Sequence, residues 1–136
     1  MVRILTEHFM TPDIVAVDED TPVTEAAKLM AVEDIGSLLV MRNDVLVGIL
    51  TMRDVISAQL LSDQTFHSLV VRDIMSSPLV SVTPDADLWE VVKLMDNTGK
   101  HHIPVVSGSA AIGIVTASDI IRALATIRLV EEGSCD

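Results

Sequence analysis

The stretch Gly48-Ile-Leu-Thr-Met-Arg-Asp54 recurs 65 residues later as Gly113-Ile-Val-Thr-Ala-Ser-Asp119. In both copies the apolar residues around Gly predict the end of a strand, and the Thr-x-x-Asp that follows has the spacing of a helix-capping box. The same 65-residue shift superimposes the rest of the repeat, with 15 identities among the 49 positions between residues 10 and 58. The chain is therefore interpreted as a tandem duplication.

Each repeat is expected to have the element order β-α-β-β-α. In the first repeat, residues 14–17 form a β-branched run, and residues 23–30 carry apolar side chains at helical spacing. Residues 37–41 and 45–50 predict the two strands of a hairpin, and a second helix follows the hairpin. The fold class is α/β (α+β), with two helices covering a three-stranded sheet in each repeat.

Two local predictions concern the first strand and the first helix. Residues 79–82, Leu-Val-Ser-Val, are the second repeat's counterpart of the strand at 14–17. In the first repeat, Thr21 is expected to cap the helix and Pro22 to be its first residue, because proline is well tolerated at that position.

The predicted boundaries leave little of the chain outside the repeats. The first repeat spans residues 1–61, a linker spans 62–71, the second repeat spans 72–130, and an acidic tail spans 131–136. Because units of about 60 residues are marginal on their own, we expect the two repeats to share a core and to form one module.

The composition limits the possible classes of protein. The chain has 136 residues, a formal net charge of −11 and 49% apolar residues. This apolar content excludes a disordered chain, yet no apolar run reaches the roughly 18 residues of a membrane helix. Glu7 interrupts the N-terminus before a signal peptide could form, so we expect an intracellular, cytoplasmic protein. The acidic charge disfavours nucleic-acid binding, and the single Cys135 excludes an internal disulfide or a cysteine-based metal site.

The repeated Gly-x-x-Thr-x-x-Asp motif has the chemistry of a binding site. The missing side chain of Gly allows another group to approach the strand, and a helix N-terminus attracts anions. A Thr hydroxyl can donate to a phosphate oxygen, and an Asp carboxylate can accept from the hydroxyls of a ribose. The alternative is that Thr and Asp only cap the helix. No common catalytic or phosphate-loop signature occurs, so an enzyme is not expected.

Three sets of residues carry a resemblance to a known family. They are the repeat openings 10–17 and 75–82, the stretch His101-His-Ile-Pro-Val-Val106, and the two Gly-x-x-Thr-x-x-Asp closings. Together they resemble the two halves of a cystathionine-β-synthase (CBS) domain pair, or Bateman module. The resemblance implies two repeats joined through their sheets about a pseudo-twofold axis, with two clefts for adenosyl ligands. It also implies a free-standing regulatory module without catalytic activity.

The resemblance also implies the residues of each cleft. A ribose would bind to Asp54 and to Asp119, with a Thr near the ribose or phosphate and apolar residues against adenine. The first cleft would contain Ile14, Ser37, Leu38, Thr51, Arg53 and Asp54, and the second would contain Leu79, Lys100, His101, His102, Ile103, Pro104, Thr116, Ser118 and Asp119. The expected ligands are AMP, ADP, ATP or S-adenosylmethionine, and neither a metal nor an obligatory cofactor is expected.

The two predicted clefts differ in charge. The segment Lys100-His101-His102 precedes the second hairpin, whereas Ile35-Gly36-Ser37 occupies these positions in the first repeat. We therefore expect the second cleft to prefer phosphorylated adenosine. Arg53, in place of Ser118, would give the first cleft a weaker phosphate contact, and S-adenosylmethionine stays a candidate there. Alternatively, one histidine packs and the other is solvated, because adjacent strand residues point to opposite faces.

Trp89 is a candidate for a subunit contact. It lies off the apolar stripe of its expected helix, and its counterpart in the first repeat is Thr24. Because the resemblance implies pairing of modules through their helices, we expect Trp89 at or near a homodimer contact; the alternative is packing inside the pair. Two functional hypotheses follow. The chain is a ligand sensor that signals to a separate effector protein, or it is a protein-protein interaction module with no physiological nucleotide.

Overall fold

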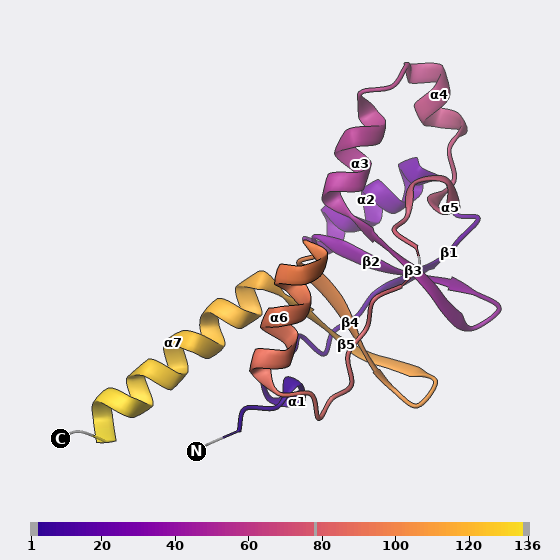
Figure 1. Ribbon diagram of the computed structural model, residues 1–136. Coiled ribbons are helices and arrows are strands. Elements are labelled where there is room, and N and C mark those ends of the chain that lie inside the picture. Colours follow the sequence, from indigo (N-terminus) through magenta and orange to yellow (C-terminus); the bar gives the residue numbers. More distant parts are fainter. Residues whose placement is uncertain (1–2, 78, 135–136) are drawn as a thin grey trace. The chain divides into compact units, whose positions relative to one another are not determined.

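The structure, a computed structural model, describes residues 3–77 and 79–134 (Figure 1). They form two compact units. The first-repeat unit comprises Ile14–Val80, and the second-repeat unit comprises Met1–Asp13 together with Ser81–Asp136. The segment that opens the first repeat therefore belongs to the second-repeat unit, and the segment that opens the second repeat belongs to the first-repeat unit.

The first-repeat unit has a three-stranded sheet with helices packed on it. Its strands are β1 (Ala16–Asp18), β2 (Ser37–Arg42) and β3 (Val45–Thr51), and its helices are α2 (Val23–Glu33), α3 (Met52–Gln59), α4 (Asp63–Ser68) and α5 (Val71–Ile74). The strand order is β1-β2-β3, with β1 parallel to β2 and β2 antiparallel to β3. The expected β-α-β-β-α order is confirmed, and α4 lies within the segment expected to be a linker.

The core of the first-repeat unit lies between the sheet and its helices. The buried residues of α2 are Val23, Ala26 and Met30, which recur at the spacing of one helical face. Ala26 and Met30 pack in one cluster with Leu50 of β3 and Val55 of α3. Fully burying side chains of this size contributes roughly 1.5–3 kcal/mol each, so the apolar stripe seen in the sequence fixes the helix on the sheet.

The second-repeat unit repeats this plan around a two-stranded hairpin. Its elements are α1 (Thr6–Phe9), α6 (Leu88–Thr98), β4 (His102–Ser107), β5 (Ala110–Thr116) and α7 (Ala117–Ser134). Leu88, Val91 and Met95 of α6 pack on Ile103 and Val115 of the hairpin. The long helix α7 extends away from β5 (Figure 1). Helix α7 includes residues 131–134, which the sequence analysis assigned to an acidic tail. Cys135 lies outside the described residues.

The second repeat lacks the first strand that residues 79–82 predict. Among these four residues, Val82 alone forms a bridge, to Val105. In the first-repeat unit the strand pairing includes a bond from the Leu39 N–H to the Val15 carbonyl (3.0 Å). The residue that matches Leu39 is Pro104, which has no N–H, so the corresponding bond cannot form and pairing is cut short.

The opening segment of each repeat completes the core of the other repeat's unit, and we call these two the exchanged opening segments. The Thr6 N–H and hydroxyl both donate to the Ala86 carbonyl (2.9 and 2.8 Å), and the Val71 N–H donates to the Thr21 carbonyl (2.8 Å). Thr6 and Val71 occupy equivalent positions of the duplication, and both are fully buried. Among the described residues, each unit has a hydrophobic cluster of its own, which is closed by a segment from beyond its own repeat.

Local chemistry explains the turns and the helix start. Asn43 and Asp44 have φ values of 49° and 65°, which a two-residue hairpin turn requires. Helix α2 begins at Val23 with Pro22 in the cap position, so the expectation of a Thr21 cap is wrong by one residue. The Thr21 N–H instead donates to a carbonyl in the preceding turn. No helix within the described ranges is long and apolar enough to cross a bilayer.

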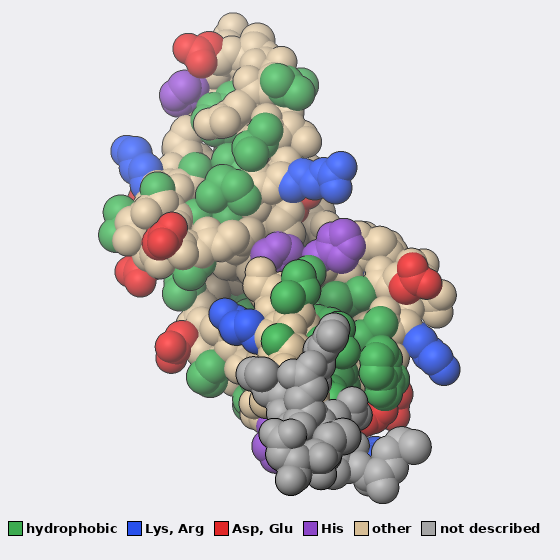
Figure 2. All heavy atoms as spheres, turned by 90° about the vertical axis from the view of Figure 1, so that its left-hand side faces the viewer, with side chains coloured by type: hydrophobic (Ala, Val, Ile, Leu, Met, Phe, Trp, Pro, Cys, Tyr) green, Lys and Arg blue, Asp and Glu red, His purple; other side chains and the backbone are tan. Residues whose placement is uncertain are grey.

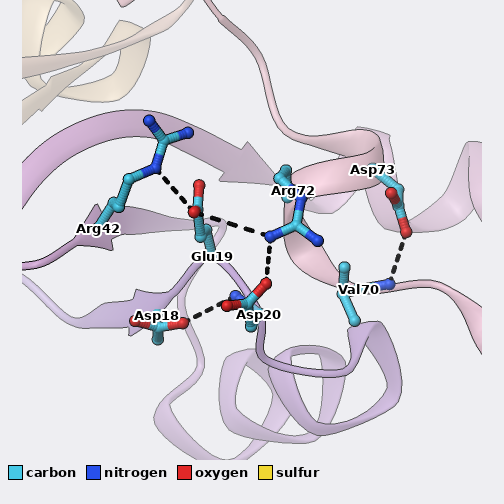
Figure 3. A network of polar contacts seen from close by, with 7 residues as sticks. All are labelled: Asp18, Glu19, Asp20, Arg42, Val70, Arg72 and Asp73. Carbon is cyan, nitrogen blue, oxygen red and sulfur yellow. Dashed lines mark hydrogen bonds and ion pairs between the residues drawn. The ribbon is translucent and has the colours of Figure 1, made fainter.

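A charged cluster fastens α5 to the end of β1 (Figure 3). Glu19 accepts a hydrogen bond from Arg42 Nε (2.7 Å), and Arg72 lies 3.7 Å from Glu19 and contacts Asp20. Glu19 is only 7% exposed, and the hydrogen bond from Arg42 holds its pKa below the ordinary value. The position that matches Glu19 in the second repeat is Pro84, so the duplication does not repeat this cluster.

Candidate functional site

In the first-repeat unit, Thr51 and Asp54 form the capping box that the sequence predicts. The Asp54 N–H donates to the Thr51 hydroxyl (3.3 Å), and Asp54 Oδ2 accepts from the N–H and the hydroxyl of Thr51 (2.8 and 3.0 Å). This exchange caps α3 and fixes the carboxylate. Asp54 is half-buried, and among the described residues no donor is bonded to its Oδ1. That oxygen is available to a ligand.

Asp119 has the equivalent position in the second-repeat unit, but its carboxylate is bonded more fully. Thr116 and Asp119 exchange the same two backbone bonds (2.8 and 3.3 Å) at the start of α7. In addition, the Thr11 hydroxyl lies 3.1 and 3.2 Å from the two carboxylate oxygens, and Arg122 forms an ion pair with Oδ1. Asp119 is 2% exposed, so its carboxylate has less capacity left for a ligand than that of Asp54.

The structure places the cationic segment of the second repeat beside the N-terminus of α7. His102 pairs with Thr116 across β4 and β5, and the Ala117 N–H donates to the His101 carbonyl (3.1 Å). His101 is exposed and precedes β4, His102 is half-buried at its start, and Lys100 is half-buried. This segment and the capping box therefore meet at one end of the hairpin.

The first-repeat unit has the same arrangement with different side chains. Ser37 pairs with Thr51 at the end of the β2-β3 hairpin. Arg53 is exposed in the first turn of α3, as Ser118 is in that of α7, and Ile14 is half-buried just before β1. Arg53 therefore places a positive charge in the first turn of α3, where the sequence analysis expects a cation.

Three of the apolar residues expected to contact adenine are buried in the protein, so a ligand cannot touch their side chains from the surface. Leu38 and Ile103 belong to the two hydrophobic cores and have no exposed surface, and Pro104 is buried in β4. An adenine ring could reach Leu38 or Ile103 only if a core opened. Leu79 is half-buried and belongs to the first-repeat unit, whereas the other expected residues of the second cleft belong to the second-repeat unit.

The two motif glycines permit a close approach, as the sequence predicts, but the approaching group is protein. A Cβ at Gly48 would lie 2.7 Å from Met75 Sδ, and one at Gly113 would lie 2.7 Å from Met10 Sδ. In both units a backbone carbonyl oxygen would lie 3.0 Å away as well. The glycines therefore make room for the exchanged opening segments.

A cavity of about 460 Å³ in the second-repeat unit brings Asp119 together with residues that the sequence did not indicate. It lies against α1 and α7, and its wall is formed by Ile4, His8, Phe9, Met10, Thr11, Pro12, Asp119, Arg122, Ala123 and Thr126. Thr11 is 108 residues from Asp119, a pairing that no local pattern predicts. Arg122 could have been found, because a charge three residues after Asp119 is at ion-pair spacing on a helix.

Two further expectations concern the surface and metals. Trp89 is 55% exposed on α6, so it does not pack inside the core of its unit. Across the described ranges, no three His, Cys, Asp or Glu side chains come together in a way that could hold a metal ion.

Comparison with known proteins gives a family. The model of the CBS domain matches twice, at residues 6–61 and 71–126. The mitochondrial CBS domain-containing protein CBSX3 of Arabidopsis thaliana is 32% identical over 110 residues, or 77% of this chain and 53% of that protein. Inosine-5'-monophosphate dehydrogenase of Korarchaeum cryptofilum is 37% identical over 84% of this chain, which corresponds to 23% of the dehydrogenase. The chain thus spans about half the length of CBSX3 and a smaller part of the dehydrogenase.

Solved structures share the fold. CBSX2 in complex with AMP superimposes with a TM-score of 0.79 and 26% identity, over 91% of this chain and 98% of that chain. The hexameric CBS-CP12 protein from bloom-forming cyanobacteria superimposes with a TM-score of 0.81 and 27% identity, over 88% of this chain and 71% of that chain. With two domain matches that account for most of its length, the chain belongs to the CBS domain family, as a tandem pair of these regulatory domains.

Proposed function

We propose that the chain is a non-catalytic sensor that binds AMP, ADP, ATP or S-adenosylmethionine and passes this occupancy to a separate partner protein. The observation that carries the proposal is the state of Asp54, whose Oδ2 is held by Thr51 while Oδ1 is available. Such an oxygen can accept hydrogen bonds from the hydroxyls of a ribose. The AMP bound to the related CBSX2 supports the choice of an adenosyl ligand.

The surroundings of Asp54 suit a nucleotide in two further respects. The carboxylate is fixed before the ligand arrives, so little conformational entropy is lost on binding. The N-terminus of α3 presents backbone N–H groups, and exposed Arg53 in its first turn adds positive charge for a phosphate. Binding of the sugar and of the phosphate would therefore be supported by neighbouring residues of one helix.

A thermal-shift series with adenosine, AMP, ADP, ATP and S-adenosylmethionine tests the proposal. A ligand at one hundred times its Kd stabilises a folded protein by about 2.7 kcal/mol, so a bound ligand should raise the melting temperature measurably. Asp54→Ala should remove most of this shift at the first-repeat site. The matched control is Asp63→Ala, which removes an exposed acidic residue from the first turn of a different helix in the same unit.

The alternative function is a protein-protein interaction module that uses no nucleotide. It is favoured by large apolar side chains on the surface, among them Ile56 (54% exposed) and Leu60 (85% exposed) on or next to α3 and Ile121 (66% exposed) on α7. Figure 2 shows several hydrophobic side chains at the surface of one face. An unchanged melting temperature with all five compounds would contradict the sensor and leave this alternative.

A further inference from the structure

Met10 holds the opening segment of the first repeat (residues 3–13) against the second-repeat unit. Its side chain packs against the core of this unit, and a Cβ at Gly113 would lie only 2.7 Å from its sulfur. The next residue, Thr11, exchanges two backbone hydrogen bonds with Ile114 of β5 (2.8 and 2.9 Å). The Thr11 hydroxyl also contacts the Asp119 carboxylate. The position of this one thioether is therefore linked to the bonding of Asp119.

The Met10 side chain can be reached from solvent. Met10 is half-buried, and it forms part of the wall of the cavity of about 460 Å³ that lies against α1 and α7. By contrast, Met30 of α2 and Met95 of α6 are 1% and 7% exposed. A thioether is oxidised where an oxidant reaches its sulfur, so a small peroxide should react with Met10 before it reacts with these two residues.

An oxygen added to the Met10 sulfur would find no hydrogen-bond donor on the side of β5. The N–H groups of Thr11 and Ile114 already donate to each other's carbonyl oxygens. The Thr11 carbonyl oxygen would itself lie 3.0 Å from a Cβ at Gly113, so the added oxygen would meet a second acceptor there. A buried polar group without a donor is unfavourable. The oxygen must therefore turn toward the cavity, where water can bond it, and this moves the sulfur away from Gly113.

We propose that Met10 is a modification site, at which oxidation by hydrogen peroxide to methionine sulfoxide releases the opening segment from the second-repeat unit. One oxygen atom passes from the peroxide to the sulfur. The O–O bond breaks, an S–O bond forms and water leaves, so the sulfur gives up an electron pair that the peroxide takes up. The product is polar, and methionine sulfoxide reductases convert it back to the thioether.

This modification acts on the fold without a bound nucleotide, so the inference goes beyond the proposed function and does not depend on it. Release of the opening segment removes Thr11 from Asp119 and opens the core that Met10 covers. The oxidant thus changes the environment of the Asp119 carboxylate, whereas the first-repeat unit, which does not contain residues 3–13, is left as it was.

Hydrogen exchange of the whole chain before and after limited treatment with hydrogen peroxide tests the inference, and peptide mapping by mass spectrometry locates each sulfoxide. Peptides of β4 and β5 should exchange at least about tenfold faster once Met10 carries the oxygen, the effect expected for a buried polar group without a partner. Met10→Leu keeps an apolar side chain of similar volume but has no sulfur, so its β4 and β5 peptides should keep their protection. Both methionine sulfoxide reductases together should restore the protection of the wild type.

The duplication supplies the matched control. Met75 has the equivalent place in the first-repeat unit, where a Cβ at Gly48 would lie 2.7 Å from its sulfur. Met75→Leu should therefore respond to peroxide in β4 and β5 as the wild type does. Met52, which is 38% exposed on α3, lies outside both opening segments, and its oxidation alone should leave the exchange of β4 and β5 unchanged.

Met10→Gln makes the test independent of the oxidant. It places an amide where the sulfoxide would be, and it should reproduce the faster exchange of β4 and β5 without peroxide. A sulfoxide at Met10 that leaves this exchange unchanged would overturn the inference. Equal loss of protection in peroxide-treated Met10→Leu, or oxidation of Met30 and Met95 ahead of Met10, would overturn it as well. A loss that the two reductases fail to reverse would indicate damage to the fold and would count against a modification site.

Discussion

Glu19 shows how a single buried carboxylate couples stability to pH. Its hydrogen bond from Arg42 lowers its pKa below the ordinary value of 4.5. A carboxylate with a lowered folded-state pKa stabilises the fold above its unfolded pKa, and this contribution is lost as the pH falls through the folded value. We therefore expect the free energy of unfolding of the wild type to decrease more steeply with acid below pH 4.5 than that of Glu19→Gln.

Urea unfolding at a series of pH values measures this difference in slope. Glu25→Gln serves as the control, because Glu25 is exposed in the first turn of α2 and has no ion pair among the described residues. Parallel curves for wild type and Glu19→Gln below pH 4.5 would show that the cluster in Figure 3 does not couple protonation to folding.

The motif glycines give a second prediction for single residues. Gly48→Ala and Gly113→Ala should each destabilise the chain by roughly 1–3 kcal/mol, because a Cβ would meet a methionine sulfur and a carbonyl oxygen that cannot both move away. Chemical denaturation of both variants checks this. Ala110→Gly, at the exposed start of β5, controls for backbone entropy. A change of less than about 0.5 kcal/mol in either glycine variant would mean that the opening segment adapts at little cost.

Among the elements, the short helix α1 should matter more than its length suggests. Ile4, Phe9 and Met10 pack against the core of the second-repeat unit, and Thr6 is fully buried there. Removing one such buried side chain costs roughly 2–5 kcal/mol of folding free energy. The loss of several together is therefore comparable to the whole folding free energy of a small domain. Deleting residues 1–10 should therefore unfold the second-repeat unit, while the first-repeat unit, which does not contain this segment, stays folded.

Hydrogen exchange followed by mass spectrometry resolves the two units in one experiment. Peptides from β4 and β5 should lose protection after the deletion, and peptides from β2 and β3 should keep it. The reciprocal substitution Val71→Asp, which places a charge at the buried position equivalent to Thr6, should reverse this pattern. Equal loss of protection in both units after the deletion would contradict the assignment of α1 to one unit.

Elements with a periodic pattern could be predicted from the sequence, and elements without one could not. The stripe of Val23, Ala26 and Met30 and the capping residues Thr51 and Asp54 act within a few residues of each other, so the sequence alone predicts them. Helix α1 has four residues, too few for a period, and its packing on α7 joins distant parts of the chain. The second repeat lacks its first strand because one N–H is missing at Pro104, and strand propensity does not predict this loss.

At the scale of the whole molecule, the duplication predicted the plan of each repeat, because 65-residue self-similarity is independent of where segments pack, and the repeated motifs carried the resemblance to the family. It could not predict which unit each opening segment completes. Nor could it predict the environment of Asp119, since Thr11 reaches it from the other end of the chain. The 65-residue shift identifies which positions of the two repeats are equivalent. Equivalent sites still differ chemically, because the opening segments are exchanged and because side chains differ, as Arg122 differs from Ser57 at the matching position.

The assembly of the chain with a second copy is the remaining prediction at this scale. Trp89 is 55% exposed on α6, where a large aromatic side chain carries unfavourable solvation unless a partner covers it. We expect sedimentation to give the mass of two chains of 14.7 kDa, and Trp89→Ala to weaken the dimer by at least about tenfold, as loss of an aromatic anchor does. Val45→Ala, which removes another exposed apolar side chain from the start of β3, should leave the dimer intact. An unchanged dimer in Trp89→Ala would place the contact elsewhere, and a monomeric wild type would contradict pairing itself.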